Sequence, residues 1–338
     1  MTSAGACGPA RAARSTSRRA RPLALLLALA LALLPLPACR GAARADEPLL
    51  DRIASELRLT EGAVRFAVIG DAGTGGRAQY EVAGRLAEAH RRFPFEFVLM
   101  LGDNLYGLER PSDYARKFEQ PYAPLLEQGV TFHAALGNHD NVSQRLYEPF
   151  HMGGERYHHF RKGNARFFAL DSNYVDPAQL AWLERELAAA DEPWKICFFH
   201  HPLYSSGDRH GPSLELRRVL EPILVRHGVR VVFAGHEHFY ERIAPQHGVH
   251  HFISGAAGKL LRGDIRKSGI TVRGFDRDYS FMLVEIDGDA LRFEAVARSG
   301  TIVDAGVIPV REEERQDRDA EMASGGGAPA GAPGAAAR

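Results

Sequence analysis

The side chains with the most chemical potential in this sequence fall in five short motifs, each placed just after an apolar run. The motifs are Gly70-Asp71-Ala72-Gly73, Gly102-Asp103-Asn104-Leu105-Tyr106, Gly137-Asn138-His139-Asp140, His200-His201-Pro202 and Gly235-His236-Glu237-His238. Together they supply carboxylates, an amide, imidazoles and a phenol, a mixture that can hold two hard or borderline metal ions side by side. Proteins that hydrolyse phosphoesters often use two metal ions bound close together.

Asp71 and Asp103 are the hard anionic donors of this set. One of these carboxylates can bridge both ions and fix their separation. Asn138 offers a neutral amide oxygen, which leaves its ion more Lewis-acidic than a further carboxylate would. A single Gly-Asp pair is usually only a turn, but two such pairs at strand ends favour a metal site.

The imidazoles come from two of the motifs. His236 and His238 are two residues apart, and in an extended segment such residues point to the same side. Both rings can therefore reach the metal pair. His200 follows another apolar run and supplies one more imidazole, whereas we expect its neighbour His201 to face away.

His139 follows Asn138 directly and cannot easily point at the same ion, so it suits proton donation to a leaving alkoxide. Asp140 is placed to orient that ring. Tyr106 is the discriminating residue, because a phenolate is a hard oxygen donor that favours a trivalent ion. Aromatic packing would be the simpler explanation of Tyr106 if Asp103 did not stand three residues earlier.

Strands and helices must alternate to position these motifs. Runs of strand character are Val64 to Ile69, Phe95 to Leu101, Val130 to Leu136, Arg166 to Asp171 (paired with Arg156 to Phe160), Lys195 to Phe199 and Val229 to Ala234. Helices are expected at Arg77 to Arg92, Tyr114 to Leu126, Pro177 to Ala190 and Ser213 to His227. Antiparallel strands are expected at His250 to Ser254, Phe281 to Ile286, Leu291 to Ala297 and Thr301 to Ile308, with a hairpin turn at Gly288.

This pattern predicts an α/β fold, a four-layer α/β/β/α sandwich in which two mixed sheets pack face to face with helices outside. Ligand sites in open α/β sheets lie beyond the carboxyl ends of the strands, where all five motifs fall. Cys197 lies inside the apolar run Ile196-Cys197-Phe198-Phe199 and is expected to be a small core residue rather than a nucleophile.

The motif set resembles that of the calcineurin-like metallophosphoesterases, and the tyrosine makes it similar to the purple acid phosphatases of the short, tartrate-resistant type. The resemblance covers roughly Val64 to Ala297. It extends to Leu180-Ala181-Trp182-Leu183, His210-Gly211-Pro212 and Ile253-Ser254-Gly255-Ala256.

The resemblance implies a role for each site residue. Asp71, Tyr106 and His238 would bind a ferric ion, and Asp103 would bridge it to the second ion. Asn138, His200 and His236 would bind that second, divalent ion, which is iron, zinc or manganese. His139 and His210 would hold the substrate and donate a proton.

The implied reaction is hydrolysis of phosphomonoesters by in-line attack of a metal-bound hydroxide, without a covalent phosphoenzyme. A phosphodiesterase or nucleotide pyrophosphatase on the same scaffold remains open, because substrate choice depends on loops such as Tyr204 to Pro212 and Gly258 to Asp278. A remote alternative is a lipid-anchored protein that binds phosphate or metal without turnover. That protein would be expected to lack a ligand or His139, and this sequence lacks neither.

The charge balance limits the partners. Acidic and basic residues number 42 each, but residues 1–38 hold five arginines and no acid. The remaining chain has 37 basic and 42 acidic residues, a formal net charge of −5. No basic stripe of the kind that binds nucleic acid remains. We therefore expect no nucleic-acid partner. The resemblance implies a small phosphorylated substrate, and we expect a monomer that contacts a membrane only through an N-terminal lipid anchor.

The N-terminus has the pattern of an export signal, with arginines before the Leu/Ala run Leu23 to Leu34. Leu36-Pro37-Ala38-Cys39 resembles a bacterial lipobox, in which Cys39 would be lipidated. Ordinary cleavage, twin-arginine export through Arg18-Arg19 and an uncleaved membrane anchor are the alternatives. The expected location is the periplasm, the outer membrane through a lipid anchor, or the medium.

Four segments follow from these patterns. Residues 1–39 form the export signal with its lipobox-like end, and residues 40–62 form a linker. Residues 63–310 form the catalytic domain. Residues 311–338 begin as a charge run, end in Gly/Ala/Pro repeats and are expected to be disordered.

Overall fold

Two mixed β-sheets form the centre of the computed structural model, which describes residues 57–310. The first sheet has the order β13-β12-β11-β1-β2-β3, and the second has the order β10-β8-β9-β7-β6-β5-β4. The first comprises β1 (Val64–Ile69), β2 (Phe97–Met100), β3 (Thr131–Ala134), β11 (Ser280–Asp287), β12 (Ala290–Ala297) and β13 (Ile302–Pro309). The second comprises β4 (His158–Lys162), β5 (Ala165–Ala169), β6 (Trp194–Phe199), β7 (Val231–Ala234), β8 (Tyr240–Ile243), β9 (His250–Ser254) and β10 (Thr271–Phe275).

The strands that precede the motifs are the parallel ones. β1, β2 and β3 run parallel to one another, as do β5, β6, β7 and β9. The remaining strands, β4, β8 and β10 to β13, pair antiparallel with their neighbours, including β11 with β1 and β4 with β5. Parallel neighbours end at the same edge of a sheet, so the motifs are brought together there.

An aromatic core joins the two sheets. The Phe66 ring of β1 lies 5.2 Å from Phe97 of β2, 5.2 Å from Phe167 of β5 and 6.1 Å from Phe233 of β7, measured between ring centroids. Successive side chains of a strand point to opposite faces. Phe66 therefore enters this inner core, whereas its neighbour Ala67 packs in the outer cluster beneath the helices.

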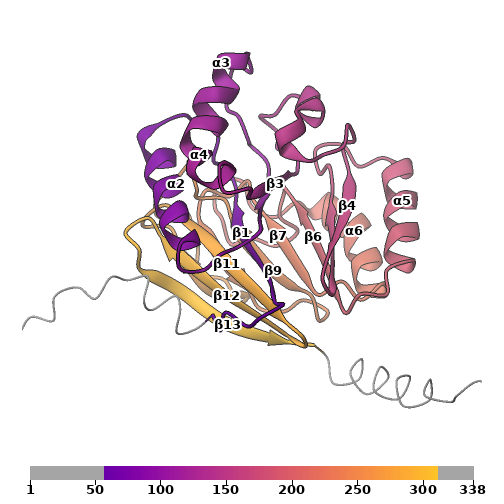
Figure 1. Ribbon diagram of the computed structural model, residues 1–338. Coiled ribbons are helices and arrows are strands. Elements are labelled where there is room, and N and C mark those ends of the chain that lie inside the picture. Colours follow the sequence, from indigo (N-terminus) through magenta and orange to yellow (C-terminus); the bar gives the residue numbers. More distant parts are fainter. Residues whose placement is uncertain (1–56, 311–338) are drawn as a thin grey trace, which may run out of the picture. The chain divides into compact units, whose positions relative to one another are not determined.

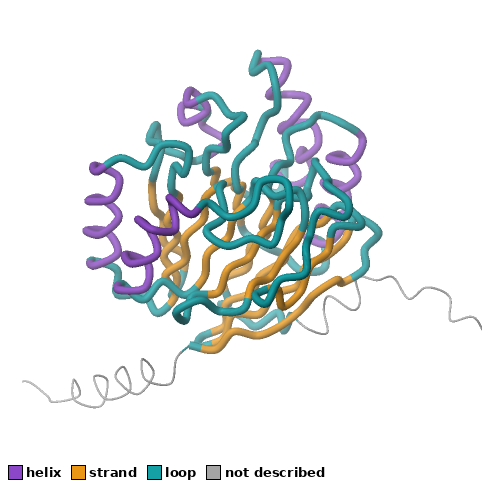
Figure 2. Tube along the Cα trace, turned by 180° about the vertical axis from the view of Figure 1, so that it is seen from behind, coloured by secondary structure: helices purple, strands orange, loops and turns teal. Residues whose placement is uncertain are grey.

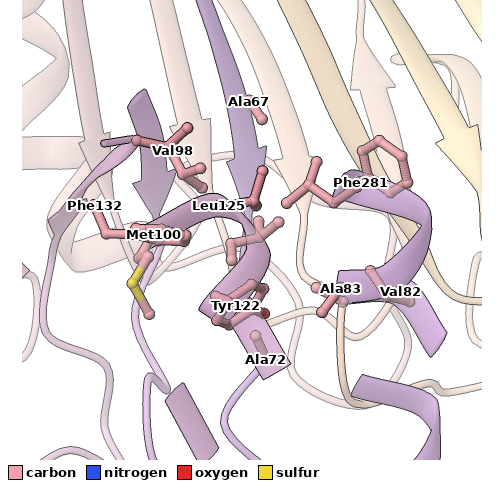
Figure 3. Packing of buried hydrophobic residues seen from close by; sticks show 14 of the residues in the cluster. Ala67, Ala72, Val82, Ala83, Val98, Met100, Tyr122, Leu125, Phe132 and Phe281 are labelled. Carbon is pink, nitrogen blue, oxygen red and sulfur yellow. The ribbon is translucent and has the colours of Figure 1, made fainter. Parts of the chain in front are cut away.

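Helices cover both outer faces (Figure 1). α2 (Arg77–His90) and α4 (Gln120–Leu126) pack on the first sheet, and α5 (Pro177–Ala188) and α6 (Leu214–Arg226) pack on the second. Figure 3 shows Val82 and Ala83 of α2 beside Phe281 of β11, with Leu125 of α4 in the same buried cluster. Figure 2 shows from behind that the strands lie between the helices. The predicted four-layer sandwich is confirmed.

Three predictions of local structure were wrong in detail. The helix expected at Tyr114 to Leu126 begins earlier, as α3 (Pro111–Tyr114), and continues through a π-helical turn (Ala115–Glu119) into α4. β8 and β10 were not predicted, because the charged pair Glu241-Arg242 interrupts β8 and because β10 is mostly exposed. The strand at His250 to Ser254 is antiparallel only to β8, since its other neighbour, β7, runs parallel to it.

The packed unit begins before residue 63. Leu57 is fully buried, and the backbone N–H groups of Arg58 and Thr60 donate hydrogen bonds of 2.7 and 2.9 Å to the carboxylate of Glu285. Residues 57–62, predicted as the end of a linker, are therefore part of the domain. Between residues 57 and 310, no helix is both long and apolar enough to cross a membrane. The predicted export signal with Cys39, the rest of the linker and the tail 311–338 lie outside the described residues.

Candidate dinuclear metal centre

Three site residues have a left-handed backbone just after a strand. Asp71 follows β1 with a φ of +55°, Asp103 follows β2 with a φ of +51°, and His236 follows β7 with a φ of +69°. Non-glycine residues rarely adopt this conformation, which persists where the surrounding structure imposes it. At each of these residues the backbone turns sharply after the strand, so the polar side chains that follow the strand lie at the edge of the sheet.

One group of donor atoms gathers around Tyr106. Its Oη lies 3.2 Å from Oδ1 of Asp71 and 3.3 Å from Nε2 of His238. The triangle closes with 3.4 Å between His238 Nε2 and Asp71 Oδ1. A carboxylate, a phenol and an imidazole from three separate motifs therefore converge on one point.

A second group gathers around Asn138. Its Oδ1 lies 2.9 Å from Nε2 of His200 and 3.1 Å from Nδ1 of His236. These two ring nitrogens are 3.1 Å apart. Nδ1 of His200 lies 2.9 Å from the carbonyl oxygen of Leu101, so it donates to that oxygen and leaves the lone pair of Nε2 facing the group.

Asp103 lies between the two groups. Its Oδ1 is 3.5 Å from Nε2 of His200 and accepts a 3.0 Å hydrogen bond from the backbone N–H of His139. Its carboxylate also neighbours the side chains of Asp71 and Tyr106. This is the position that a ligand shared by two ions would occupy.

The electrostatics of the site fit two cations. Asp71 and Asp103 are buried, and no lysine or arginine among residues 57–310 forms an ion pair with either. Burial, and then the Asp103 charge, raise the pKa of Asp71 well above its usual range, and burial holds the pKa of His200 well below its own. Buried acids normally require a cationic partner or a metal ion, and this donor set offers places for two ions.

Asp140 has a different task from the one predicted. Its carboxylate accepts hydrogen bonds from the backbone N–H groups of Gly137, Asn104 and Leu105, at 2.8, 3.0 and 3.0 Å. Asp140 therefore ties the Asp103 loop to the Asn138 loop and does not orient the ring of His139. That ring instead lies 4.9 Å from the ring of Tyr106, measured between centroids.

His201 does not face away, as the sequence analysis expected. Its ring lies 4.5 Å from that of His236 and 4.9 Å from that of His200. The Oγ of Ser172 lies 3.0 Å from Nδ1 of His201 and accepts a 3.0 Å hydrogen bond from its backbone N–H. β6 ends at Phe199, so the side-chain alternation of a strand no longer holds at His201.

His210 reaches the site from the loop after β6. Its ring lies 4.5 Å from that of His236 and 5.8 Å from that of His238, and its Nδ1 donates to the carbonyl oxygen of His236 at 3.2 Å. The structure thus brings His210 to the same place as the other predicted residues.

Glu237 holds the His210 loop, a role that the sequence did not reveal. Its buried Oε1 accepts hydrogen bonds from Oγ of Ser205 at 2.9 Å and from the backbone N–H of Gly211 at 2.6 Å. The only signal in the sequence was that Glu237 stands between His236 and His238. In an extended segment the middle side chain points away from the other two.

The donor groups open into a cleft of about 370 Å³. It is lined by Asp103, Tyr106, Asn138, His139, Arg209, His210, His236, His238, Lys259, Leu260 and Leu261. Arg209 and Lys259 were not singled out from the sequence. Nζ of Lys259 lies 4.4 Å from the centroid of the Tyr106 ring.

Paired sheets with carboxylate, amide, imidazole and phenol donors beyond their strand ends define a phosphoesterase of the two-metal class. Comparison with known proteins agrees, because the model of the calcineurin-like phosphoesterase family matches residues 64–240. The chain belongs to this family and is a metal-dependent phosphoric ester hydrolase.

Three individual proteins illustrate the relationship. Tartrate-resistant acid phosphatase type 5 of Oryctolagus cuniculus is 30% identical over 237 residues, which are 57% of this chain and 72% of that protein. Purple acid phosphatase PPD1 from yellow lupin superposes with a TM-score of 0.61 at 19% identity, over 76% of this chain and 55% of that chain. GAP50, the anchor in the inner membrane complex of Plasmodium, superposes with a TM-score of 0.66 at 20% identity, over 77% and 95%. The two structures share the fold.

Proposed function

We propose that the protein is an exported acid phosphatase that hydrolyses phosphomonoesters at a centre of one ferric and one divalent ion. The observation that carries this proposal is the position of Tyr106, whose Oη lies within 3.3 Å of both Asp71 and His238. Burial and the two neighbouring carboxylates raise the pKa of Tyr106. A cation of high charge is therefore needed to convert this phenol into a phenolate ligand.

Each donor group would hold one ion. Asp71, Tyr106 and His238 would hold the ferric ion, and Asp103 would be shared. Asn138, His200 and His236 would hold the divalent ion, which is iron, zinc or manganese. When bound, the two ions acidify a water nucleophile and neutralise the phosphoryl oxygens, which supports in-line displacement.

Two histidines at the cleft would complete the reaction. His139 is held by the contact of its backbone N–H with Asp103, and its ring is free to donate a proton to the leaving oxygen. His210 lies on the other loop and would hold the phosphoryl group. None of the described residues that line the cleft is serine or cysteine, which supports direct hydrolysis without a covalent intermediate. Cys197 is buried in the core beneath α5 and α6.

The visible absorption spectrum of the full chain, purified aerobically with iron, tests this proposal. A tyrosinate bound to ferric iron gives a charge-transfer band, so we expect a purple protein whose colour disappears in Tyr106→Phe. Turnover of p-nitrophenyl phosphate by the same preparation tests the phosphatase activity. A protein that is active and loaded with metal but colourless would refute the ferric assignment and favour manganese or zinc.

The two alternatives predict different results. A phosphodiesterase or nucleotide pyrophosphatase would hydrolyse bis-p-nitrophenyl phosphate or a nucleoside triphosphate better than the monoester. A protein without turnover, comparable to a fold relative described as an anchor, would bind phosphate tightly and hydrolyse none of these substrates. All seven proposed ligands and His139 are present, which favours an enzyme.

We also propose that the protein acts outside the cytoplasm as a monomer, without nucleic acid as partner. The N-terminal signal pattern supports export, and Cys39 would attach the protein to the membrane through a lipid. In a bacterial host, Cys39→Ala is expected to move the protein from the membrane fraction to the soluble fraction. Unchanged fractionation would refute lipidation at Cys39.

A further inference from the structure

A buried lysine lies next to the Tyr106 loop and has no place in the reaction described above. Lys117 is only 3% exposed, although lysine is rarely buried in folded proteins. It lies in the π-helical turn Ala115–Glu119, and its neighbour Phe118 packs in the outer cluster beneath the helices. Since π-helical turns are rare and often occur at functional sites, the contacts that this turn gives to Lys117 point to a function.

The ammonium group of Lys117 donates to the backbone of the Tyr106 loop. Its Nζ lies 2.6 Å from the carbonyl oxygen of Tyr106 and 2.6 Å from that of Leu108. Oδ1 of Asp113 is a third oxygen near Nζ, at 3.6 Å. An ammonium group has three donors and no acceptor, so each donor has an oxygen to face. Hydrogen bonds from a charged donor are the strong ones, and two of them meet here on one short segment of backbone.

The same lysine is tied to the glycine-rich loop that follows β1. The fully buried side chain of Gln79 accepts a 2.7 Å hydrogen bond from the backbone N–H of Gly75 and donates to the carbonyl oxygen of Lys117. The backbone N–H of Tyr106 donates to the carbonyl oxygen of Gly73 at 2.9 Å. Both backbone polar groups of Tyr106 are therefore held, by two segments that Gln79 links to each other.

Side-chain packing does not anchor the two residues that follow Tyr106. Gly107 has a φ of +78°, and no atom lies within 4 Å of the position that a Cβ would take there. Leu108 is 64% exposed. The bonds from Lys117 to the carbonyl oxygens of Tyr106 and Leu108 therefore restrain this part of the loop, from which the Tyr106 ring extends to Asp71 and His238.

We propose that Lys117, supported by Gln79, is a positioning residue that keeps Oη of Tyr106 at the place of the ferric ion. The inference rests on the proposed function, because it takes Tyr106 as a metal ligand. Lys117 is not among the described residues that line the cleft, so it acts only through Tyr106. Removing a group that orients a metal ligand typically changes the metal affinity about 10–100-fold.

The first test uses the full chain with Lys117→Met, which has a side chain of similar length and no charge. We expect ferric iron, measured by competition with a chelator, to bind roughly tenfold more weakly, and the charge-transfer band to lose intensity per bound iron. Lys117→Arg keeps a charged donor and should recover part of both. Lys195→Met is the matched control and should change neither. Its Nζ donates to the carbonyl oxygen of His227 at 3.0 Å, at the opposite end of β6 from His200.

Hydrogen exchange of the metal-free chain separates this inference from the proposed function. The backbone N–H of Tyr106 should exchange at least roughly tenfold faster in Lys117→Met than in the wild type and in Lys195→Met. If the wild type is purple, an unchanged band and iron affinity in folded Lys117→Met would overturn the positioning role. If the wild type is colourless, the ferric assignment fails, and the exchange rate alone supports or overturns the restraint by Lys117.

A second variant covers the case in which Lys117→Met does not fold. Gln79→Met removes the link between Gly75 and Lys117 without leaving a buried charge unpaired. It should weaken the band and speed the exchange of the Tyr106 N–H in the same direction. An unchanged band in a purple protein, or an unchanged exchange rate in a colourless one, would then overturn the inference.

Discussion

His133 is expected to make the protein less stable in acid, although the enzyme resembles acid phosphatases. His133 is on β3 and stacks on Phe160 of β4, with ring centroids 3.8 Å apart, where the edges of the two sheets meet. Its titratable neighbours are His151, His158 and Lys162, all of which are cationic when charged. Burial first, and then these neighbours, lower the pKa of His133 to about 3.

The pH dependence follows from the difference between the folded and unfolded chains. The unfolded chain binds this proton at a pKa of about 6.5, and the folded protein binds it only near 3. The stability contributed by neutral His133 is therefore fully present above about pH 6.5 and is lost progressively as the pH falls toward the folded value. At about pH 5, the loss relative to about pH 7.5 is about 2 kcal/mol.

His133→Phe isolates this contribution. Phenylalanine keeps the flat ring that stacks on Phe160 and removes the proton. Nδ1 of His133 makes no hydrogen bond with any described residue, and the variant loses only the 3.4 Å hydrogen bond between Nε2 and Oγ1 of Thr131. Urea unfolding of the metal-free full chain is followed at about pH 7.5 and about pH 5, with the exposed His247→Asn as control. Between about pH 7.5 and about pH 5, the free energy of unfolding of the wild type and of the control should fall by about 2 kcal/mol more than that of His133→Phe. For an m-value of about 3 kcal/mol/M, this difference shifts the urea midpoint by about 0.7 M. Equal losses in all three proteins would refute the reasoning.

Three further predictions concern the metal centre. Asp103→Ala should remove both ions and lower kcat/KM roughly 1,000-fold or more. Turnover and metal content are measured on the same sample, and full activity with full metal content would contradict a shared ligand. Glu237→Ala should release the His210 loop and lower kcat about tenfold, whereas Glu237→Gln keeps the acceptor oxygen and most of the activity; equal effects would argue against a positioning role. Chelation should lower the melting temperature, because Asp71 and Asp103 are buried together; an unchanged melting temperature would show that the ions are not coupled to stability.

The layers and most elements could be predicted because they depend on local patterns. β1 is an apolar run because Phe66 packs on its inner face and Ala67 on its outer face, and such a run is visible in the sequence. The missed elements had weak patterns. β10 is mostly exposed and has no apolar alternation, and it is held by pairing with β8, which only the folded chain reveals.

The seven proposed ligands could be placed together because parallel strands end at one edge. The errors began where the strands ended. His201 and Asp140 both follow a strand by a few residues, and there the direction of a side chain depends on turns such as those at Asp71 and His236, whose φ values are +55° and +69°. No periodicity in the sequence encodes these left-handed residues, since the surrounding packing imposes them.

The rim of the cleft was the least predictable part of the site. Arg209 and Lys259 are 50 residues apart on loops without apolar pattern, and only the contacts between those loops bring them to one cleft. The ligand motifs are constrained by chemistry, because few side chains can hold two ions. The rim has no such constraint, so relatives with the same ligands can differ there. The ligand set therefore determines the reaction class, and the rim residues must be located in three dimensions before a substrate class can be inferred.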